Sequence, residues 1–183
     1  MNLSTCSLLE NNTTPAEYFD LRARVYKDEH DVDIPQHPDT FDKIGHLFGI
    51  FSDSQLVGGA RLTINGEQGI PLEHHGVSLS DYFNEDALKS AFYGEISRLF
   101  IRTEFRSWRL LEKLYSPIYT VMQKSGFSFF VSIGPIKQLR ITAMLCTRFG
   151  WEKFMTRNIK FDPKYSHVGE FCLVKATLPA IDA

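Results

Sequence analysis

The sequence has no extended stretch of one charge sign and no long apolar run. Its 183 residues include 20 Lys and Arg against 22 Asp and Glu, which leaves a formal net charge of −2 at pH 7. A basic tract that could follow a nucleic-acid backbone is missing, so nucleic acid is not an expected partner. No apolar segment approaches the ~20 residues that a membrane-spanning helix needs. We therefore expect no transmembrane segment.

Cysteine is also scarce. Cys6, Cys146 and Cys172 are odd in number, far apart and form no CxxC pair. This spacing predicts neither a disulfide framework nor a zinc site, and it suits the reduced thiols of a cytoplasmic protein. The first residues lack the basic and apolar regions of a secretion signal, so we expect a cytoplasmic location. The oligomeric state stays open.

Metal-binding patterns are sparse as well. His74 and His75 are adjacent, and the side chains of neighbours in an extended chain point apart. They are accompanied by no Cys, Asp or Glu at ligand spacing, so no metal site is predicted. Cys146 lies on a segment with the pattern of a packed helix, which makes a nucleophilic role an unfavoured interpretation.

Apolar residues are present in ordinary proportion. Hydrophobic residues make up 43% of the chain, and 15 of its residues are Phe. This composition and length predict one globular domain over residues 1–183 with a sizeable core. Five aromatic residues could either fill that core or line an acyl pocket, and the sequence leaves both interpretations open: Phe100, Phe127, Phe129, Phe130 and Trp151.

The apolar periodicity predicts a mixed α/β fold. We expect strands at 3–9, 46–51, 56–64, 92–102, 127–133, 151–161 and 168–177. We expect a helix capped by Thr13 or Thr14, helices at 106–124 and 136–149, and a short helical piece within 65–90. Residues 27–42 are polar and predict a loop. This order predicts a central mixed sheet flanked by helices.

The order of these elements resembles the fold of the Gcn5-related N-acetyltransferases (GNAT). In that family, a Gln/Arg-x-x-Gly-x-Gly/Ala loop at a strand-to-helix junction binds the pyrophosphate of coenzyme A through backbone N–H groups. The matching segment here is Arg106-Ser-Trp-Arg109-Leu-Leu111. The first arginine is kept, and Arg109 and Leu111 replace both glycines. An ordinary acetyl-CoA-dependent acetyltransferase is therefore one alternative rather than the first choice.

A narrower resemblance links the chain to the acyl-homoserine-lactone synthases, which make quorum-sensing signals, and to the N-acyl amino acid synthases. Four short motifs match in order: Arg22 with Tyr26, Asp39-Thr-Phe-Asp42, Arg61-Leu62, and Glu95-Ile-Ser97-Arg98. The segment from Ser97 to Arg106 is more similar to the amino acid synthases. Residues 31–34 hold no Trp, whereas the lactone synthases carry one near their S-adenosylmethionine site.

The resemblance implies transfer of a fatty-acyl group from acyl carrier protein or acyl-CoA to the amine of a small acceptor. S-adenosylmethionine is an acceptor that the resemblance allows, and no tightly bound cofactor or metal is required. Two alternatives remain besides the acetyltransferase. One is a lactone synthase proper, and the other is a non-catalytic binding module that retains the fold.

The same resemblance suggests roles for individual residues. Glu95 would act as general base, with Ser97 and Arg98 beside it in the motif; the alternative is a structural ion pair of Glu95 with Arg98 or Arg61. A bulge in this strand, as in GNAT proteins, could bring Glu95 and Arg98 together. The amides of Phe100, Ile101 and Arg102 would polarise the thioester carbonyl.

The resemblance also implies a second group. Five charged residues of alternating sign, Arg22, Asp39, Asp42, Arg61 and Arg98, would form an ion-pair network that orders the N-terminal loop over the active site. These residues and Tyr26 would contact the substrate, and the acidic members could hold its ammonium group; ordinary surface charge is the alternative, which spacing alone favours. Arg102, Arg106 and Arg109, followed by Lys113, form a basic strip. This strip could contact phosphopantetheine or acyl carrier protein, or could be a solvated helix start.

Overall fold

The computed structural model describes residues 5–9 and 14–179, and these form two compact units. The first unit takes in the described residues up to Thr63 together with Ile96–Met122. The second takes in Ile64–Glu95 and the described residues from Gln123 onward. Strand β4 (Tyr93–Ile101) contributes to both, because the boundary falls after Glu95. The prediction of a single domain over 1–183 stays a prediction.

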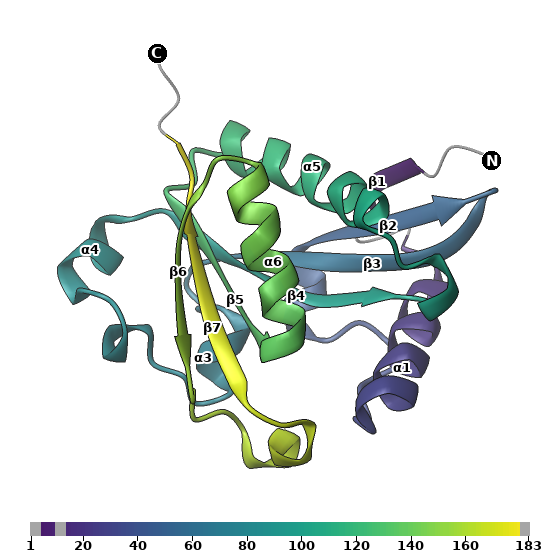
Figure 1. Ribbon diagram of the computed structural model, residues 1–183, viewed down its shortest axis with the longest axis horizontal. Helices are drawn as coiled ribbons and strands as arrows, with labels where there is room; N and C mark the ends of the chain where they lie inside the picture. Colours follow the sequence, from purple (N-terminus) through teal and green to yellow (C-terminus); the bar gives the residue numbers. More distant parts are fainter. Residues whose placement is uncertain (1–4, 10–13, 180–183) are drawn as a thin grey trace. The chain divides into compact units, whose positions relative to one another are not determined.

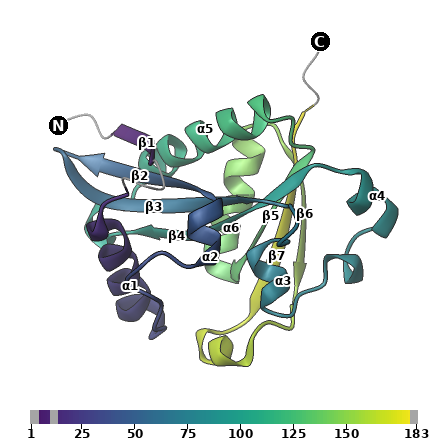
Figure 2. The same ribbon diagram turned by 180° about the vertical axis from the view of Figure 1, so that it is seen from behind.

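The first unit pairs its strands in the order β1-β2-β3-β4. Its further elements are β1 (Thr5–Leu9), α1 (Ala16–His30), α2 (Thr40–Ile44), β2 (His46–Ser52), β3 (Gln55–Ile64), the 3-10 turn η2 (Thr103–Phe105) and α5 (Trp108–Lys124). Neighbours β1 and β2, and β2 and β3, are antiparallel. In Figures 1 and 2, α1 and α2 lie on one side of β2 and β3, and α5 lies on the other.

The strands predicted at 46–51 and 56–64 are confirmed as β2 and β3, which form a hairpin. A two-residue turn joins them, with Ser52 opposite Gln55. The turn residues Asp53 and Ser54 have φ values of 50° and 66°. Positive φ at both central positions is the backbone geometry of the hairpin turn that matches the strands' right-handed twist.

Gly59 of β3 allows helix α1 to pack closely on this hairpin. A Cβ placed on Gly59 would lie 2.5 Å from the carbonyl oxygen of Phe48 and 2.6 Å from the ring of Tyr18. The Tyr18 hydroxyl donates a hydrogen bond to the Ala60 carbonyl oxygen at 3.1 Å. Tyr18 also makes an edge-to-face contact with Phe100, and both rings belong to the core beneath α1. The close approach fixes where α1 places Arg22, one turn further on.

Two predictions around α1 need correction. The residue before the helix is Pro15, without a side-chain capping bond, so Thr14 is not the cap, and Thr13 lies outside the described residues. The helix also continues to His30, four residues into the predicted loop. Helix α2, which the sequence interpretation missed, begins at Thr40 within that loop and ends at Ile44. Asp39 caps α2 and explains why a helix begins there.

The second unit pairs its strands in the order β4-β5-β7-β6. Its further elements are α3 (Pro71–His74), η1 (Leu79–Asp81), α4 (Glu85–Ser90), β5 (Phe129–Pro135), α6 (Ile136–Arg148), β6 (Glu152–Arg157), η3 (Pro163–Val168) and β7 (Phe171–Thr177). Strands β4 and β5 are parallel, whereas β7 is antiparallel to both β5 and β6. The prediction of a mixed sheet flanked by helices is confirmed.

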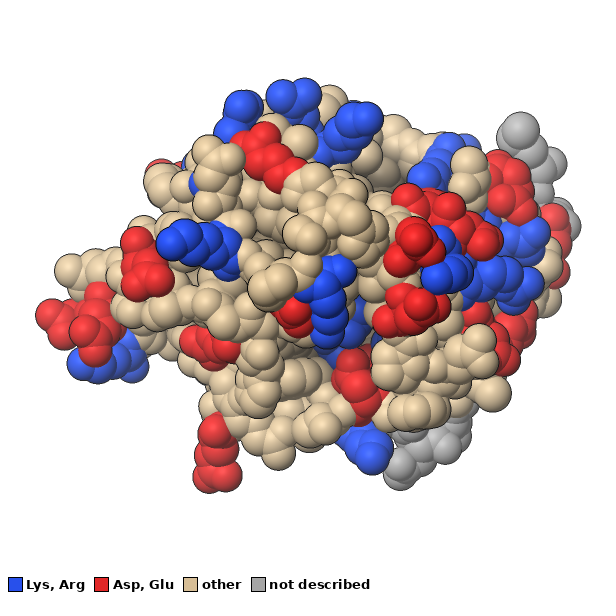
Figure 3. Space-filling model, turned by 90° about the horizontal axis from the view of Figure 1, so that it is seen from below, with Lys and Arg blue, Asp and Glu red and all other residues tan. Residues whose placement is uncertain are grey.

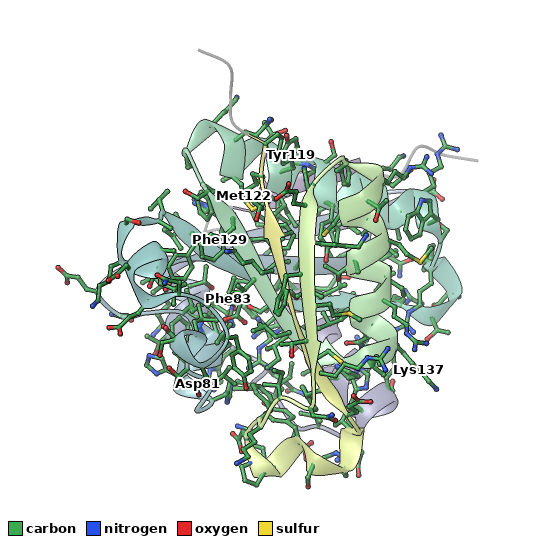
Figure 4. The ribbon with its side chains drawn as sticks, turned by 60° about the vertical axis from the view of Figure 1, so that its left-hand side comes forward. Asp81, Phe83, Tyr119, Met122, Phe129 and Lys137 are labelled. Atoms are coloured by element: carbon green, nitrogen blue, oxygen red, sulfur yellow. The ribbon has the colours of Figure 1, made fainter. Side chains whose placement is uncertain are left out.

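Aromatic residues of the second unit fill its interior. Phe130 is fully buried and meets Trp151 edge to face, and Tyr93 stacks on Phe129 at 4.7 Å. Figure 4 shows Phe129 and Phe83 in this part of the molecule, and the ammonium of Lys175 lies over both rings. Of the two interpretations offered by the sequence, core packing accounts for these side chains. Within residues 5–9 and 14–179, no helix is long and apolar enough to cross a bilayer.

Candidate functional site

The centre of the first unit holds a buried ion pair between α1 and α2. Arg22 donates to both carboxylate oxygens of Asp42, with Nη1–Oδ1 and Nη2–Oδ2 distances of 2.8 Å. Both side chains are fully buried. Such a two-pronged pair between a guanidinium and a carboxylate is short, directional and stronger than a neutral hydrogen bond. Arg22 therefore ties the loop after α1 back onto the helix.

Arg61 of β3 extends this pair into a network. Its Nη1 donates to Asp39 Oδ1 at 2.8 Å and to Asp42 Oδ1 at 3.0 Å, and its Nε donates to Ser97 Oγ at 3.2 Å. Arg61 is 1% exposed. A buried guanidinium costs several kcal/mol unless it is paired, and these three bonds supply the partners. The network thus joins α1, α2, β3 and β4.

The two aspartates also cap helix α2. Asp39 Oδ1 accepts from the backbone N–H of Asp42 at 2.8 Å, and Asp42 Oδ2 accepts from the backbone N–H of Asp39 at 2.9 Å. This reciprocal arrangement satisfies two N–H groups that the helix itself leaves unpaired. The Asp-x-x-Asp spacing is therefore a structural requirement of α2 as well as a feature of the matched motif.

The network keeps Asp42 ionised. Burial by itself would raise the pKa of Asp42, but the hydrogen bonds from Arg22 and the positive charges of Arg22 and Arg61 outweigh it. The pKa of Asp42 consequently lies below its ordinary value of 3.8. Both of its oxygens already accept hydrogen bonds from protein groups. Asp42 is thus engaged in holding the loop, and the proposed contact with a substrate ammonium group has no support from its geometry.

Accessible side chains border the network on one side. Arg98 is 15% exposed in its side chain, and its Nη2 lies 3.8 Å from Asp39 Oδ2. Its guanidinium carbon lies 5.8 Å from the ring centre of Tyr26, which is half-buried. Together Tyr26, Asp39, Ser97 and Arg98 form the part of the predicted set that remains in reach of a ligand; we call these four residues the open edge.

Arg98 has an unusual backbone for a strand residue. Its φ is 53°, in the left-handed region that residues with a Cβ rarely adopt. The sequence interpretation expected a bulge in this strand, and a left-handed residue within β4 is the kind of irregularity that a bulge requires. Such strain persists where surrounding contacts over-determine it, and it often accompanies a functional site.

Glu95 belongs to the second unit and has a different environment. It is 2% exposed, and its Oε2 accepts from the backbone N–H of Leu72 at 2.7 Å. Leu72 is in the first turn of α3. The backbone N–H of Ile70, the residue before this helix, donates to the Glu73 carboxylate. Glu95 is the last β4 residue paired with β5, opposite Val131. The role of Glu95 as general base stays a prediction. The structure adds that its carboxylate accepts a hydrogen bond from the Leu72 backbone N–H.

Sequence reasoning missed the link between Glu95 and α3. The two groups are 23 residues apart, and the local signal was only a proline followed by an acid, Pro71 and Glu73, which is a helix-start pattern. The alternative of an ion pair with Arg61 is not supported, because Arg61 donates to Asp39, Asp42 and Ser97.

One of the expected oxyanion donors is used elsewhere. The backbone N–H of Arg102 donates to the Val57 carbonyl oxygen at 2.9 Å, so it serves the pairing of β4 with β3. This corrects the assignment of that amide to the thioester carbonyl. Phe100 and Ile101 are buried, and the side chain of Phe100 packs in the core below α1. Their amides stay the predicted donors.

The basic strip at the start of α5 is largely paired. Arg106 forms an ion pair with Glu29 and donates from Nε to the Ile101 carbonyl oxygen at 3.0 Å. Arg102 pairs with Glu104, and Arg109 is exposed. Figure 3 shows acidic and basic side chains intermingled on the face that it presents. The strip therefore offers less net positive charge to an acidic partner than its sequence suggests.

The helix start that replaces the glycine-rich loop is also capped. Ser107 Oγ accepts from the Leu110 backbone N–H at 3.2 Å, and the Ser107 carbonyl oxygen accepts from Leu110 and Leu111. In a glycine-rich loop, such N–H groups are left to bind phosphate. Here Arg109 and Leu111 replace the glycines, and the N–H groups of Leu110 and Leu111 donate to Ser107.

The remaining candidates are structural. His74 contacts the Gln68 carbonyl oxygen, and His75 contacts Asp162 and packs on the Phe161 ring. Burial raises the pKa of Cys146 to about 12, which disfavours the thiolate that a nucleophile needs. Among the residues that the structure describes, no three His, Cys, Asp or Glu are grouped to hold a metal ion.

Comparison with known proteins gives the family. The sequence profile described as the Acetyltransferase (GNAT) domain matches residues 21–116, which is more than half of the chain. The chain belongs to the GNAT acyltransferase family. It is an N-acyltransferase of the GNAT type, and the matched segment includes the whole Arg22–Asp42–Arg61 network and Glu95. A search among curated proteins finds no match.

Solved structures confirm the GNAT fold. The chain is similar to FeeM, an N-acyl amino acid synthase from uncultured soil microbes, at 14% identity and a TM-score of 0.67, over 97% of this chain and 91% of FeeM. It is similar to the AHL synthase LasI at 14% identity and a TM-score of 0.64, over 98% and 92%. It is similar to BjaI, a CoA-dependent acyl-homoserine lactone synthase, at 12% identity and 0.62, over 96% and 84%.

Proposed function

We propose that this GNAT protein transfers a fatty-acyl group from acyl carrier protein or acyl-CoA to the amine of a small, amino-acid-like acceptor. One observation carries the proposal. The residues of the first three matched motifs, Arg22, Asp39, Asp42 and Arg61, assemble into one hydrogen-bonded network, which a chance match of surface charges would not do. The likeness to FeeM, LasI and BjaI supports the same class of reaction.

The network has a positioning role in this proposal. Arg22, Asp42 and Arg61 are buried, so they act through the segment that they hold rather than by touching the acceptor. Contact with the acceptor falls to the open edge of Tyr26, Asp39, Ser97 and Arg98. A carboxylate and a guanidinium together suit an acceptor that carries both an ammonium and a carboxylate group, as an amino acid does.

The chemistry requires one proton acceptor. The acceptor amine attacks the thioester carbonyl carbon, the carbon–sulfur bond breaks, and an amide and a free thiol are formed. The amine must lose a proton, and we assign its removal to Glu95, through a water molecule because the carboxylate is 2% exposed. The amides of Phe100 and Ile101 are the proposed donors to the oxyanion. No covalent enzyme intermediate or metal is needed.

The test is to incubate the protein with a series of acyl carrier proteins and acyl-CoAs, together with amino acids and S-adenosylmethionine. Mass spectrometry then identifies any amide or lactone. We expect a long-chain N-acyl amino acid whose formation falls about 10²–10⁴-fold in Glu95→Gln, the usual contribution of general-base catalysis. A lactone product would instead identify a homoserine-lactone synthase.

Glu73→Gln is the matched control. Glu73 accepts from an N–H at the start of α3, as Glu95 does, so its loss tests the effect of weakening that helix start alone. We expect Glu73→Gln to retain activity. If both variants lose activity equally, Glu95 is structural; if neither changes and no amide forms with any donor, the protein is a binding module.

An ordinary acetyl-CoA-dependent acetyltransferase is the second candidate. It is favoured by the family description itself, which is that of an acetyltransferase domain. The capped start of α5 speaks against it, because Ser107 and the side chain of Arg109 replace the open glycine loop. Faster turnover with acetyl-CoA than with any long-chain donor would decide for this candidate.

A further inference from the structure

The last turn of helix α1 carries an acidic residue where a helix disfavours negative charge. Glu29 is the penultimate residue of α1, and the unpaired carbonyl groups at a helix C-terminus give that end a partial negative charge. The Glu29 carboxylate is compensated from outside the helix, because it forms an ion pair with Arg106 and its Oε1 accepts from Thr103 Oγ1 at 3.4 Å. These partners follow Glu29 by 77 and 74 residues. The last turn of α1 is therefore tied to the segment after β4.

Arg106 is also hydrogen-bonded to the end of β4. Its Nε donates to the Ile101 carbonyl oxygen at 3.0 Å, five residues back along the chain. The N–H of the same peptide group belongs to Arg102 and donates to the Val57 carbonyl oxygen at 2.9 Å. The peptide group that joins Ile101 to Arg102 is thus hydrogen-bonded at its oxygen and at its nitrogen. Arg106 fixes one of these two ends, and at the same time it holds Glu29 of α1.

The two ends of this arrangement carry groups with proposed roles in acyl transfer. Tyr26 of the open edge lies three residues before Glu29, so both side chains project from one side of α1. Ile101 carries one of the two amides proposed to donate to the oxyanion. Arg106 therefore links the helix turn that places Tyr26 with the residue that supplies an oxyanion donor. A displacement of about 1 Å at either place can cost roughly 100-fold in rate.

The exposure of the Glu29–Arg106 pair indicates that it contributes to orientation more than to stability. The Arg106 side chain is 44% exposed, and that of Glu29 is 19% exposed. Ion pairs at the surface contribute little to the free energy of unfolding. A guanidinium nevertheless donates in a fixed planar geometry, and here its Nη2 and its Nε bind two different elements. The position of α1 relative to the end of β4 therefore depends on one rigid group.

We propose that Arg106 and Glu29 are positioning residues for acyl transfer, with Arg106 acting through Ile101 and Glu29 acting through Tyr26. This inference rests on the proposed function, and it replaces the phosphopantetheine contact that the sequence suggested for Arg106. A donor phosphate that bound Arg106 would compete with the Glu29 carboxylate for the same guanidinium. Positioning makes the reaction depend on Glu29 as well as on Arg106, whereas phosphate binding makes it depend on Arg106 alone.

The kinetic test compares Arg106→Gln with Glu29→Gln. We measure kcat and the KM of each substrate, using the acyl-CoA and the amino acid that form an amide. We expect kcat/KM for the amino acid to fall about tenfold or more in each variant, with KM for acyl-CoA changed by less than about twofold. The double variant Glu29→Gln/Arg106→Gln should lose no more than Arg106→Gln alone, because the two residues act through one contact.

Two exposed residues of α1 provide matched controls. Asp28→Asn removes an acid from the same last turn and Arg24→Gln removes an arginine, and neither residue belongs to the Glu29–Arg106 pair. We expect both controls to keep the wild-type kinetics. All four single variants should keep the wild-type Tm within about 4 °C, because exposed ion pairs contribute little to stability.

A second measurement reports on the pair without any turnover. Burial lowers the pKa of His30 below its ordinary value of 6.5, the negative charge of Glu29 opposes that shift, and the positive charge of Arg106 adds to it. Titration of His30 by NMR should therefore show a higher pKa in Arg106→Gln and a lower pKa in Glu29→Gln than in the wild type. An unchanged His30 titration in both variants would show that the two charges do not lie beside this helix end, and would overturn the inference.

The outcomes separate this inference from the proposed function. If KM for acyl-CoA rises about tenfold in Arg106→Gln while Glu29→Gln behaves like the wild type, Arg106 is a ligand of the donor phosphate and the inference is wrong. If Asp28→Asn loses as much activity as Glu29→Gln, the effect comes from charge at the helix end, and the inference is again wrong. Amide formation with wild-type kinetics in both Gln variants would refute the positioning role alone. Opposite shifts of the His30 pKa, with no amide from any donor, would support the Glu29–Arg106 pair and refute the proposed function.

Discussion

The buried network of the first unit and the exposed side of helix α6 in the second unit use arginine in opposite ways. Arg22 and Arg61 are at most 1% exposed, and carboxylates within about 3 Å accept their hydrogen bonds. Arg140 is exposed on a helix that contains no acid. A pattern of charges in the sequence does not separate the two cases. Burial and the identity of the partner do separate them: the first set is buried and paired with carboxylates, and Arg140 lies at the surface.

The largest expected effect is on the stability that the network provides. Asp42→Ala removes the carboxylate shared by Arg22 and Arg61 and leaves two buried guanidinium groups with fewer partners. We expect the free energy of unfolding to fall by about 3–5 kcal/mol in urea denaturation. Asp33→Ala is the control, since Asp33 pairs with Lys27 at the surface and its loss should cost no more than about 1 kcal/mol. Similar losses of stability in Asp42→Ala and Asp33→Ala would show that the buried ion pairs stabilise the protein no more than a surface pair does.

A smaller loss of stability should follow from replacing the planar guanidinium of Arg22 with an ammonium group of the same charge. Arg22→Lys keeps the positive charge but replaces the two parallel hydrogen bonds to Asp42 with a single ammonium. We expect a loss of about 1.5–3 kcal/mol in the free energy of unfolding, the range for a charged hydrogen bond. Arg24→Lys, at an exposed position of the same helix, should be neutral. If Arg22→Lys left the free energy of unfolding unchanged, the positive charge alone would account for the stabilisation.

Acid should weaken the network, because Asp42 accepts hydrogen bonds from the two arginines as an ionised carboxylate. The pKa of Asp42 is lower in the folded protein than its ordinary value of 3.8, so the ionised carboxylate stabilises the folded state at pH values above 3.8. That contribution is lost as the pH falls from 3.8 through the folded-state pKa. Urea midpoints measured down this range should fall more steeply for the wild type than for Asp42→Asn. If the urea midpoints of the two proteins fell in parallel with pH, the ionised form of Asp42 would not be the source of this stability.

The smallest expected effect is on the stability of α6. Lys137→Gln and Arg140→Gln remove exposed charges, so the free energy of unfolding should change by no more than about 0.5 kcal/mol. Thermal and urea denaturation measure this directly. A loss comparable with that of Asp42→Ala would show that these side chains have structural partners, and the comparison between the two regions would then fail.

Much of the fold could be predicted from the sequence because its signals are local. The hairpin of β2 and β3 follows from two apolar runs around a short polar turn, and α6 runs from Ile136 to Arg148, close to the predicted 136–149. Helix α2 was missed because five residues carry too little periodicity. Its start was nevertheless visible: Asp39 and Asp42 have the spacing of a capping box, although the two residues were assigned to loop ordering and substrate contact and not to a helix cap.

The candidate site was harder to predict, because its contacts join distant segments. The alternating charges suggested that Arg22, Asp39, Asp42 and Arg61 act together, but their spacing carries no information on burial. The sequence also gave no sign that the Arg102 amide is used by Val57, or that Glu29 neutralises Arg106. Those partners lie 45 and 77 residues away, beyond any local pattern. The partner of Glu95 was missed for the same reason.

Asp39 and Asp42 each accept a hydrogen bond from the start of α2 and another from an arginine. The cap of α2 and the buried ion-pair network therefore depend on the same two side chains. Unwinding α2 would remove the geometry that Arg22 and Arg61 require, and displacing either arginine would loosen the cap. The segment from Asp39 to Ile44 should accordingly open and close as one cooperative piece, with amide hydrogens that exchange at a common rate. A ligand that engages Asp39 or Arg98 at the open edge would slow that exchange throughout the segment.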